Sequence, residues 1–191
     1  MSRVLILYGT TDGHTHKVAA FLGKTFEQEG CHVDVFDAAS GPTLQLDNYD
    51  GVVVAASVHI GGFQRPVRRW VHAHAAWLSR MPTAFLCVCL GILEQRPEAQ
   101  REVEQIMQKF LNQTGWQPTT TMAVAGAVPF TRYTWFKKLV MRRIVAKAGG
   151  GTDTGRDYEY TDWDALRTFG RSFVRAHELA YPPLAAPEVR V

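Results

Sequence analysis

The residues best suited to chemistry form a short loop rich in threonine, following an apolar run over residues 3–8. The members of this loop are Thr10, Thr11, Asp12, Gly13, His14 and Thr15. Threonine hydroxyls donate hydrogen bonds to an anion, and Gly13 permits a tight turn that exposes backbone N–H groups. His14 and Thr15 begin a predicted helix, whose positive end favours an anion. The loop therefore predicts a binding site for a ligand phosphate.

The motif of this loop differs from two common phosphate-binding motifs. It is not Gly-x-Gly-x-x-Gly, which disfavours a dinucleotide, and it lacks the Gly-Lys-Ser/Thr of nucleoside triphosphatases. Asp12 is expected to point outward or to bind backbone N–H groups. His14 is either a ligand contact or only the first residue of the helix. The structural alternative for the whole loop is a threonine-rich capping turn.

The elements that position this loop alternate between apolar strands and amphipathic helices. Strands are predicted over 3–8, 31–37, 51–56, 83–90 and 120–128, and helices over 14–30, 66–78, 95–114 and from Asp162 onward. The strands are apolar throughout, as expected when both faces of a parallel strand are buried. Short crossovers make the connections parallel and right-handed. The pattern predicts an α/β fold, a doubly wound five-stranded parallel sheet of order 2-1-3-4-5, whose ligand crevice lies at the ends of strands one and three.

A basic insert, at about residues 129–152, separates the fifth strand from the last helix. No Asp or Glu occurs from Gln105 to Thr152. Within the insert, apolar and basic residues recur at helical spacing: Phe136, Leu139, Val140, Arg143 and Lys147. This pattern is typical of helices on a membrane surface. The alternative is a core-packing helix with solvated lysines. Nucleic-acid binding is disfavoured, because the insert has large apolar side chains in place of the interspersed polar side chains that contact bases.

The motif Thr10-x-x-Gly13-x-Thr15 after the first strand resembles the fingerprint of the flavodoxins. The resemblance implies that the loop holds the 5′-phosphate of flavin mononucleotide (FMN), and that the loops after strands three and four hold its ring. The ring-binding candidates are Ser57, Val58, His59, Ile60, Gly61, Leu90 and Gly91. The candidates for stacking on the ring are Ile60, Phe63, Leu90 and Ile92, whereas flavodoxins typically use Trp or Tyr. An open, apolar flavin face fits a substrate enzyme better than an electron carrier.

Over residues 3 to 180 the chain resembles the flavodoxin-like, menaquinone-dependent protoporphyrinogen IX dehydrogenases of bacterial haem synthesis. Shared motifs outside the insert are Thr11-Asp12-Gly13-x-Thr15, Tyr49-Asp50, Ala56-Ser57, Met81-Pro82-x-Ala84-Phe85, Lys109-Phe110-Leu111, Ala125-Gly126-Ala127 and Tyr160-Thr161-Asp162-Trp163. The insert adds Arg132-Tyr133-x-Trp135 and Gly149-Gly150 before Thr152-Asp153-Thr154. The insert motifs are the specific ones.

The resemblance implies oxidation of protoporphyrinogen IX to protoporphyrin IX through FMN, with menaquinone or ubiquinone as acceptor. The insert residues expected to meet the substrate or an anionic membrane surface are Arg132, Tyr133, Trp135, Lys137, Lys138, Arg142 and Arg143. Arg132 and Lys137 or Lys138 would pair the substrate's propionates. His59 is a candidate base, although a loop hydrogen bond is its other interpretation. Two alternatives share the fold: an NAD(P)H:quinone oxidoreductase and an electron-carrier flavodoxin.

The bulk composition places further limits on the protein. Its 191 residues suit one domain, expected over 1–180, with a disordered tail over 181–191. The odd count of Cys31, Cys87 and Cys89, without zinc-type spacing, predicts reduced, buried thiols and no metal site. No apolar run approaches the ~20 residues that span a bilayer, and the start does not match a signal peptide. The expected location is therefore peripheral, on the cytoplasmic face of the inner membrane, and homo-oligomer formation is left open.

Overall fold

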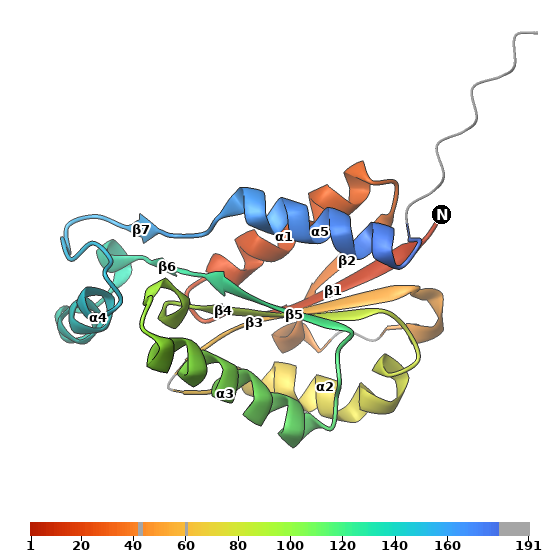
Figure 1. The fold of residues 1–191 in the computed structure, drawn as a ribbon, viewed down its shortest axis with the longest axis horizontal. Helices are drawn as coiled ribbons and strands as arrows, with labels where there is room; N and C mark the ends of the chain where they lie inside the picture. The colour runs from red at the N-terminus through yellow and green to blue at the C-terminus, as the bar shows by residue number, and fades with distance from the viewer. Residues whose placement is uncertain (42–43, 60, 180–191) are drawn as a thin grey trace, which may run out of the picture.

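A five-stranded parallel sheet with the order β2-β1-β3-β4-β5 forms the centre of the molecule (Figure 1). The computed structural model describes residues 1–41, 44–59 and 61–179. The strands are β1 (Arg3–Gly9), β2 (His32–Asp37), β3 (Gly51–Ser57), β4 (Thr83–Cys89) and β5 (Thr120–Ala125). The predicted fold class and strand order are confirmed.

Helices cover both faces of the sheet, α1 and α5 on one face and α2 and α3 on the other (Figure 1). Their bounds are α1 (His14–Gln28), α2 (Arg65–Leu78), α3 (Pro97–Thr114) and α5 (Trp163–Ala176). Short 3-10 turns complete this part of the chain: η1 (Ala38–Ser40), η2 (Leu46–Asn48) and η3 (Gly91–Leu93).

Two apolar cores lie between the sheet and the helices, one on each face. Under α1 and α5, Val18, Leu22 and Phe26 pack against the strands together with Leu166 and Phe173. The opposite core contains a cluster of aromatic side chains under α2 and α3: Phe63, Phe85, Phe110 and Trp116. Strands buried on both faces hold the loops at their carboxyl ends in fixed positions.

The helices begin where the sequence supplies suitable residues. Gly13, with φ of 91°, makes the left-handed turn that lets α1 start at His14 directly after β1. Asp162 caps α5 by accepting hydrogen bonds from the N–H groups of Asp164 and Ala165. Proline occupies the first turn of α2 and of α3.

The predicted fifth strand, 120–128, is wrong after Ala125. It breaks at Gly126, whose N–H donates to the Cys89 carbonyl and whose carbonyl accepts from Tyr160. Beyond this break, β6 (Ala127–Val128) leaves the main sheet and pairs antiparallel with β7 (Tyr158–Glu159). Periodicity did not reveal the break because residues 120–128 read as one apolar run.

The insert forms η4 (Phe130–Arg132) and α4 (Trp135–Lys147), beyond the carboxyl ends of the strands (Figure 1). A small third cluster holds it, made of Val128, Phe130, Tyr133 and Val145 with Met141 and Leu90 packed against them. The stripe predicted at helical spacing is the exposed face of α4, because Phe136, Leu139 and Val140 remain solvent-accessible. Both the buried and the exposed faces of α4 are therefore apolar.

The predictions about the cysteines, membrane spans and chain end have different outcomes. The three cysteines are buried and free, as predicted. Across the described ranges, no helix combines the length and apolar character needed to cross a bilayer. The predicted tail 181–191 and the predicted ring contact Ile60 lie outside the described residues, and the domain assignment 1–180 stays a prediction.

Candidate functional site

A cavity of about 680 Å³ opens at the carboxyl ends of β1, β3 and β4, with α3 and α4 as its walls. Of the residues predicted to bind the cofactor, it is lined by Thr10, Thr11, Asp12, His14, Thr15, Ser57, Val58, His59, Gly61, Leu90 and Gly91. Gly13 shapes the same loop without lining the cavity. The volume lies within the range of small-molecule sites.

The polar end of the cavity is built for an anion. Thr15 is 1% exposed, and its hydroxyl has no hydrogen-bond partner among the described residues. Buried hydroxyls are rarely left unpaired, so this one points to a ligand. Thr10 Oγ1 accepts a 2.9 Å hydrogen bond from Gly13 N, which shapes the loop at the start of α1. The first N–H groups of α1 are open to an anion at this point.

Gln64 connects two of the cavity loops, a role that the sequence did not reveal. Its Nε2 donates to Thr11 Oγ1 at 3.1 Å and to Ser57 Oγ at 2.8 Å. Its buried Oε1 has no partner among the residues described. Gln64 precedes α2, and only its position before a helix containing Pro66 was visible in the sequence.

The surroundings of His14 favour its neutral imidazole. Its Nε2 lies 2.6 Å from Thr161 Oγ1, which itself donates to the Ala125 carbonyl. Because Thr161 has one proton to give, it accepts from His14, so the His14 proton resides on Nε2. Burial lowers the pKa of His14, the nearby Glu159 carboxylate opposes this, and Lys17 lowers the pKa further.

Asp12 does not behave as predicted. It neither points outward nor caps backbone N–H groups: its carboxylate accepts from the Tyr133 hydroxyl and pairs with Lys137, both at 2.8 Å. Lys137 was expected to pair a substrate carboxylate, and the structure gives it this internal partner. The contact joins segments far apart in sequence, so local patterns carry no signal for it.

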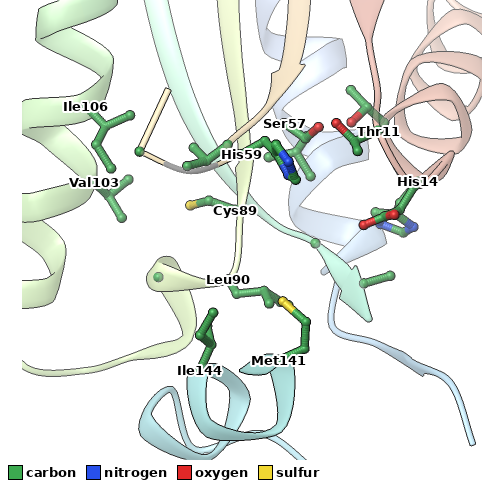
Figure 2. A pocket seen from close by; sticks show the side chains of 18 of the residues that line it. Thr11, His14, Ser57, His59, Cys89, Leu90, Val103, Ile106, Met141 and Ile144 are labelled. Atoms are coloured by element: carbon green, nitrogen blue, oxygen red, sulfur yellow. The ribbon is translucent and has the colours of Figure 1, made fainter. Parts of the chain in front are cut away.

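Both polar and apolar side chains border the region expected to hold the flavin ring (Figure 2). Leu90 and the exposed imidazole of His59 line it, and Cys89 forms part of its floor. Phe63 and Ile92 were stacking candidates, but both pack against the core instead. Phe63 lies 5.2 Å from Phe85 and 4.9 Å from Phe110 between ring centres. Leu90 is the stacking candidate that the structure places in the cavity.

The apolar end of the cavity lies between α3 and α4, and sequence reasoning missed it. Figure 2 shows Val103 and Ile106 on α3 across from Met141 and Ile144 on α4. Val103 also belongs to the core under α3, and helical spacing alone does not distinguish a core residue from a cavity wall. Two acids also line the cavity: Glu94, which follows η3 and pairs with Arg96, and Glu102 on α3.

The insert residues predicted from sequence divide into two groups. Tyr133 and Lys137 line the cavity. The others lie outside its lining: Arg132, Trp135, Lys138, Arg142 and Arg143. Trp135 is 78% exposed, and the consecutive Arg142 and Arg143 are exposed as well.

These residues fit FMN. The unpaired Thr15 hydroxyl and the start of α1 would hold its phosphate. Its ring would be bordered by Ser57, Val58, His59, Gly61, Leu90 and Gly91. A terminal monophosphate suits a loop that lacks the pyrophosphate motif. When bound, FMN supplies hydride and electron transfer, and the protein supplies position and electrostatics.

Comparisons with known proteins place this site in a family. The sequence matches the flavodoxin domain family over residues 5–155. It is 32% identical over 183 residues to protoporphyrinogen IX dehydrogenase (quinone) of Escherichia coli K12, covering 95% of this chain and 99% of that one. It is 34% identical over 182 residues to the protein of the same name from Leishmania major, covering 95% of this chain and 78% of that one.

Among solved structures, the fold is similar to oxidised flavodoxin 1 of Bacillus cereus, with a TM-score of 0.54 and 15% identity over 91% of this chain and 98% of that one. That likeness concerns the fold alone, whereas the sequence relatives cover nearly the whole chain. The chain therefore belongs to the flavodoxin domain family and, within it, to the family of the protoporphyrinogen IX dehydrogenases (quinone).

Proposed function

We propose that this protein oxidises protoporphyrinogen IX to protoporphyrin IX through FMN, with a quinone as the electron acceptor. The relatives carry the name of this activity, and they align with nearly the whole chain. The observation that supports it most is a single cavity with an anion-binding end and an apolar end. An electron-carrier flavodoxin binds no substrate of its own and needs no such apolar pocket, whereas here the apolar end would bind the substrate.

The apolar end suits a macrocycle and a quinone because both are large and poorly soluble in water. Val103 and Ile106 on one side and Met141 and Ile144 on the other would bind and orient the flat ring by apolar contact. The same walls exclude water from the reacting faces. Lys137 lies where the insert meets the loop after β1, and its side chain is 36% exposed, so it can meet a propionate while it stays bonded to Asp12.

His59 stays a prediction as the base that receives a pyrrole proton. Its imidazole is exposed at the cavity, and its backbone pairs with that of Gly62. This placement gives the side chain access to both substrate and solvent, which a proton-transfer group requires.

We further propose that α4 docks on an anionic membrane surface, at the cytoplasmic face of the inner membrane. Its exposed side chains include Trp135 at 78%, Phe136 at 62% and Leu139 at 47%. Exposed cations surround this face: Arg142, Arg143 and Lys147. Val140 and Ile144 continue the apolar surface into the cavity, so a lipid-dissolved quinone would enter without crossing water.

The test of the activity is porphyrin formation under anaerobic conditions, followed by fluorescence. Purified, FMN-loaded protein receives protoporphyrinogen IX with a menaquinone analogue, a ubiquinone analogue, NADP or no acceptor. We expect turnover with a quinone and none with NADP. Equal turnover with NADP and without quinone would support the pyridine-nucleotide alternative and contradict this proposal.

A further inference from the structure

Asp12 joins the loop after β1 to the insert by two side-chain contacts. Its Oδ2 accepts a 2.8 Å hydrogen bond from the Tyr133 hydroxyl, and its Oδ1 lies 2.8 Å from Lys137 Nζ. Lys137 Nζ also lies 3.9 Å from the centre of the Tyr133 ring. These three side chains form one cluster, here called the Asp12 clasp. It connects residues that are 121 and 125 positions apart in sequence.

The charge of Asp12 is unexpected in a loop that receives a phosphate. An ionised carboxylate only accepts hydrogen bonds, so it has nothing to donate to a phosphate oxygen. It also repels a phosphate dianion, most strongly where the surroundings are partly buried. Lys137 compensates this charge within the clasp. Asp12 is therefore better explained by what it holds on the insert than by contact with the cofactor.

The clasp acts on the helix that forms one wall of the cavity. Lys137 is the basic residue of α4 for which the described residues include an ion-pair partner. Val140, Met141 and Ile144 follow Lys137 by three, four and seven positions, so they lie on the same side of α4 and line the cavity. Fixing Lys137 therefore fixes the side of α4 that faces the substrate.

The geometry points to Asp12 as a positioning residue: it anchors α4 as the substrate wall and ties that wall to the loop that binds the cofactor phosphate. This inference rests on the proposed function for the identity of the substrate. The contact between α4 and the loop after β1 does not depend on which substrate binds. In this role Asp12 acts through its contacts with Tyr133 and Lys137.

Two single variants of the full-length, FMN-loaded protein separate this role from cofactor binding. Asp12→Asn removes a negative charge beside the phosphate, so FMN should bind as well as before or more tightly. Lys137→Met removes a positive charge there, so FMN should bind more weakly. Both variants should accelerate amide hydrogen exchange in residues 135–147 and raise the KM for porphyrinogen by ~10-fold, the effect of losing one charged hydrogen bond.

The double variant Asp12→Asn/Lys137→Met should match Lys137→Met in the rate of amide hydrogen exchange and in the KM for porphyrinogen, since both substitutions remove the contact between Asp12 and Lys137. Asp47→Asn is the control: it makes the same charge change at an exposed residue of η2 and should leave all three measurements unchanged. Loss of FMN affinity in Asp12→Asn, with unchanged exchange in α4, would overturn the inference and make Asp12 a cofactor contact.

The hydrogen-exchange and FMN-affinity measurements do not depend on the reaction. If wild-type protein fails to oxidise porphyrinogen, the proposed function fails, while faster exchange in α4 of Asp12→Asn still supports the clasp. If the wild type is active and Asp12→Asn matches it in exchange and in KM, the clasp fails and the function stands.

Discussion

At the scale of single residues, Thr15 gives the clearest prediction. Its hydroxyl is buried and unpaired among the described residues, at the start of α1. Thr15→Val keeps the shape and removes the donor, so FMN affinity should fall by about 10- to 100-fold, the value of one hydrogen bond to a charged group. Equilibrium titration of the deflavinated protein with FMN, followed by flavin fluorescence, measures this change.

Thr25→Val is the matched control for Thr15→Val. Thr25 is a buried threonine of the same helix, but its hydroxyl donates to the Phe21 carbonyl. This variant should lower thermal stability and leave FMN affinity unchanged. If both variants bind FMN like the wild type, the phosphate does not lie at Thr15.

His14 predicts a dependence of stability on pH. Its pKa is lowered by burial in the folded protein, so below a pH of about 6.5 the unfolded chain binds a proton that the folded chain resists. The free energy of unfolding should therefore decrease as pH falls below 6.5, until the folded protein also takes up the proton. His14→Gln should remove this part of the decrease.

Chemical denaturation between pH 5 and pH 7.5, in wild type and His14→Gln, measures the difference. His72→Gln, which changes an exposed histidine of α2, is the control and should keep the wild-type profile. An identical pH profile in His14→Gln and wild type would show that His14 does not carry this dependence.

The residues that line the cavity could be predicted more easily than their hydrogen-bond and ion-pair partners. The threonine loop and the glycine-containing loop after β3 follow apolar strands directly, and local sequence is enough to find them. The contact of Asp12 with Tyr133 and Lys137, and the bridge made by Gln64, depend on tertiary placement. Phe63 was misassigned because a loop aromatic and a core aromatic look alike in sequence.

At the scale of elements, α4 carries the prediction about membranes. Arg142→Glu/Arg143→Glu reverses two exposed charges beside Trp135 and Leu139. At ~1 kcal/mol for each cation near an anionic surface, binding to vesicles of phosphatidylglycerol and phosphatidylcholine should fall by at least ~30-fold. The loss should be larger at low salt, because salt screens surface charges.

Arg68→Glu/Arg69→Glu makes the same change in net charge on α2 and is the control. Both residues are exposed and adjacent, like their counterparts on α4. This variant should sediment with vesicles as the wild type does. Equal loss in the two variants would mean that net charge, and not α4, determines binding, and no loss in either would reject membrane docking by this helix.

Element types and order were predictable because a short continuous apolar run indicates a buried parallel strand, and apolar residues at a 3.6-residue period indicate an amphipathic helix. The break at Gly126 was not, because the residues on both sides of it are apolar. The existence of α4 was predicted, whereas its orientation was not. Both of its faces are apolar, so the sequence alone does not say which one packs against Phe130 and Leu90.

At the scale of the whole molecule, the insert is separable from the two main cores. Neither core contains a residue of 129–152. Replacing residues 132–147 by a short Gly-Ser linker should therefore leave a cooperative thermal transition, with a Tm lowered by less than about 10 °C. The shortened protein should still bind FMN, more weakly because Asp12 loses Lys137, and lose most porphyrinogen oxidation.

Leu86→Ala provides the contrast for this deletion. Leu86 is fully buried in the central sheet, and its truncation should cost about 2–5 kcal/mol while leaving the insert in place. A deletion variant without a cooperative transition would show that α4 completes the fold. A deletion variant with full activity would show that the insert serves neither substrate nor membrane.

The most direct test of the central claim is an anaerobic titration of the FMN-loaded protein with protoporphyrinogen IX, without quinone. The oxidation removes six electrons and FMN accepts two, so three flavins should bleach for each porphyrin that becomes fluorescent. Adding a menaquinone analogue should then restore the yellow colour. A flavin that porphyrinogen leaves oxidised, but that NADPH bleaches, would contradict the account.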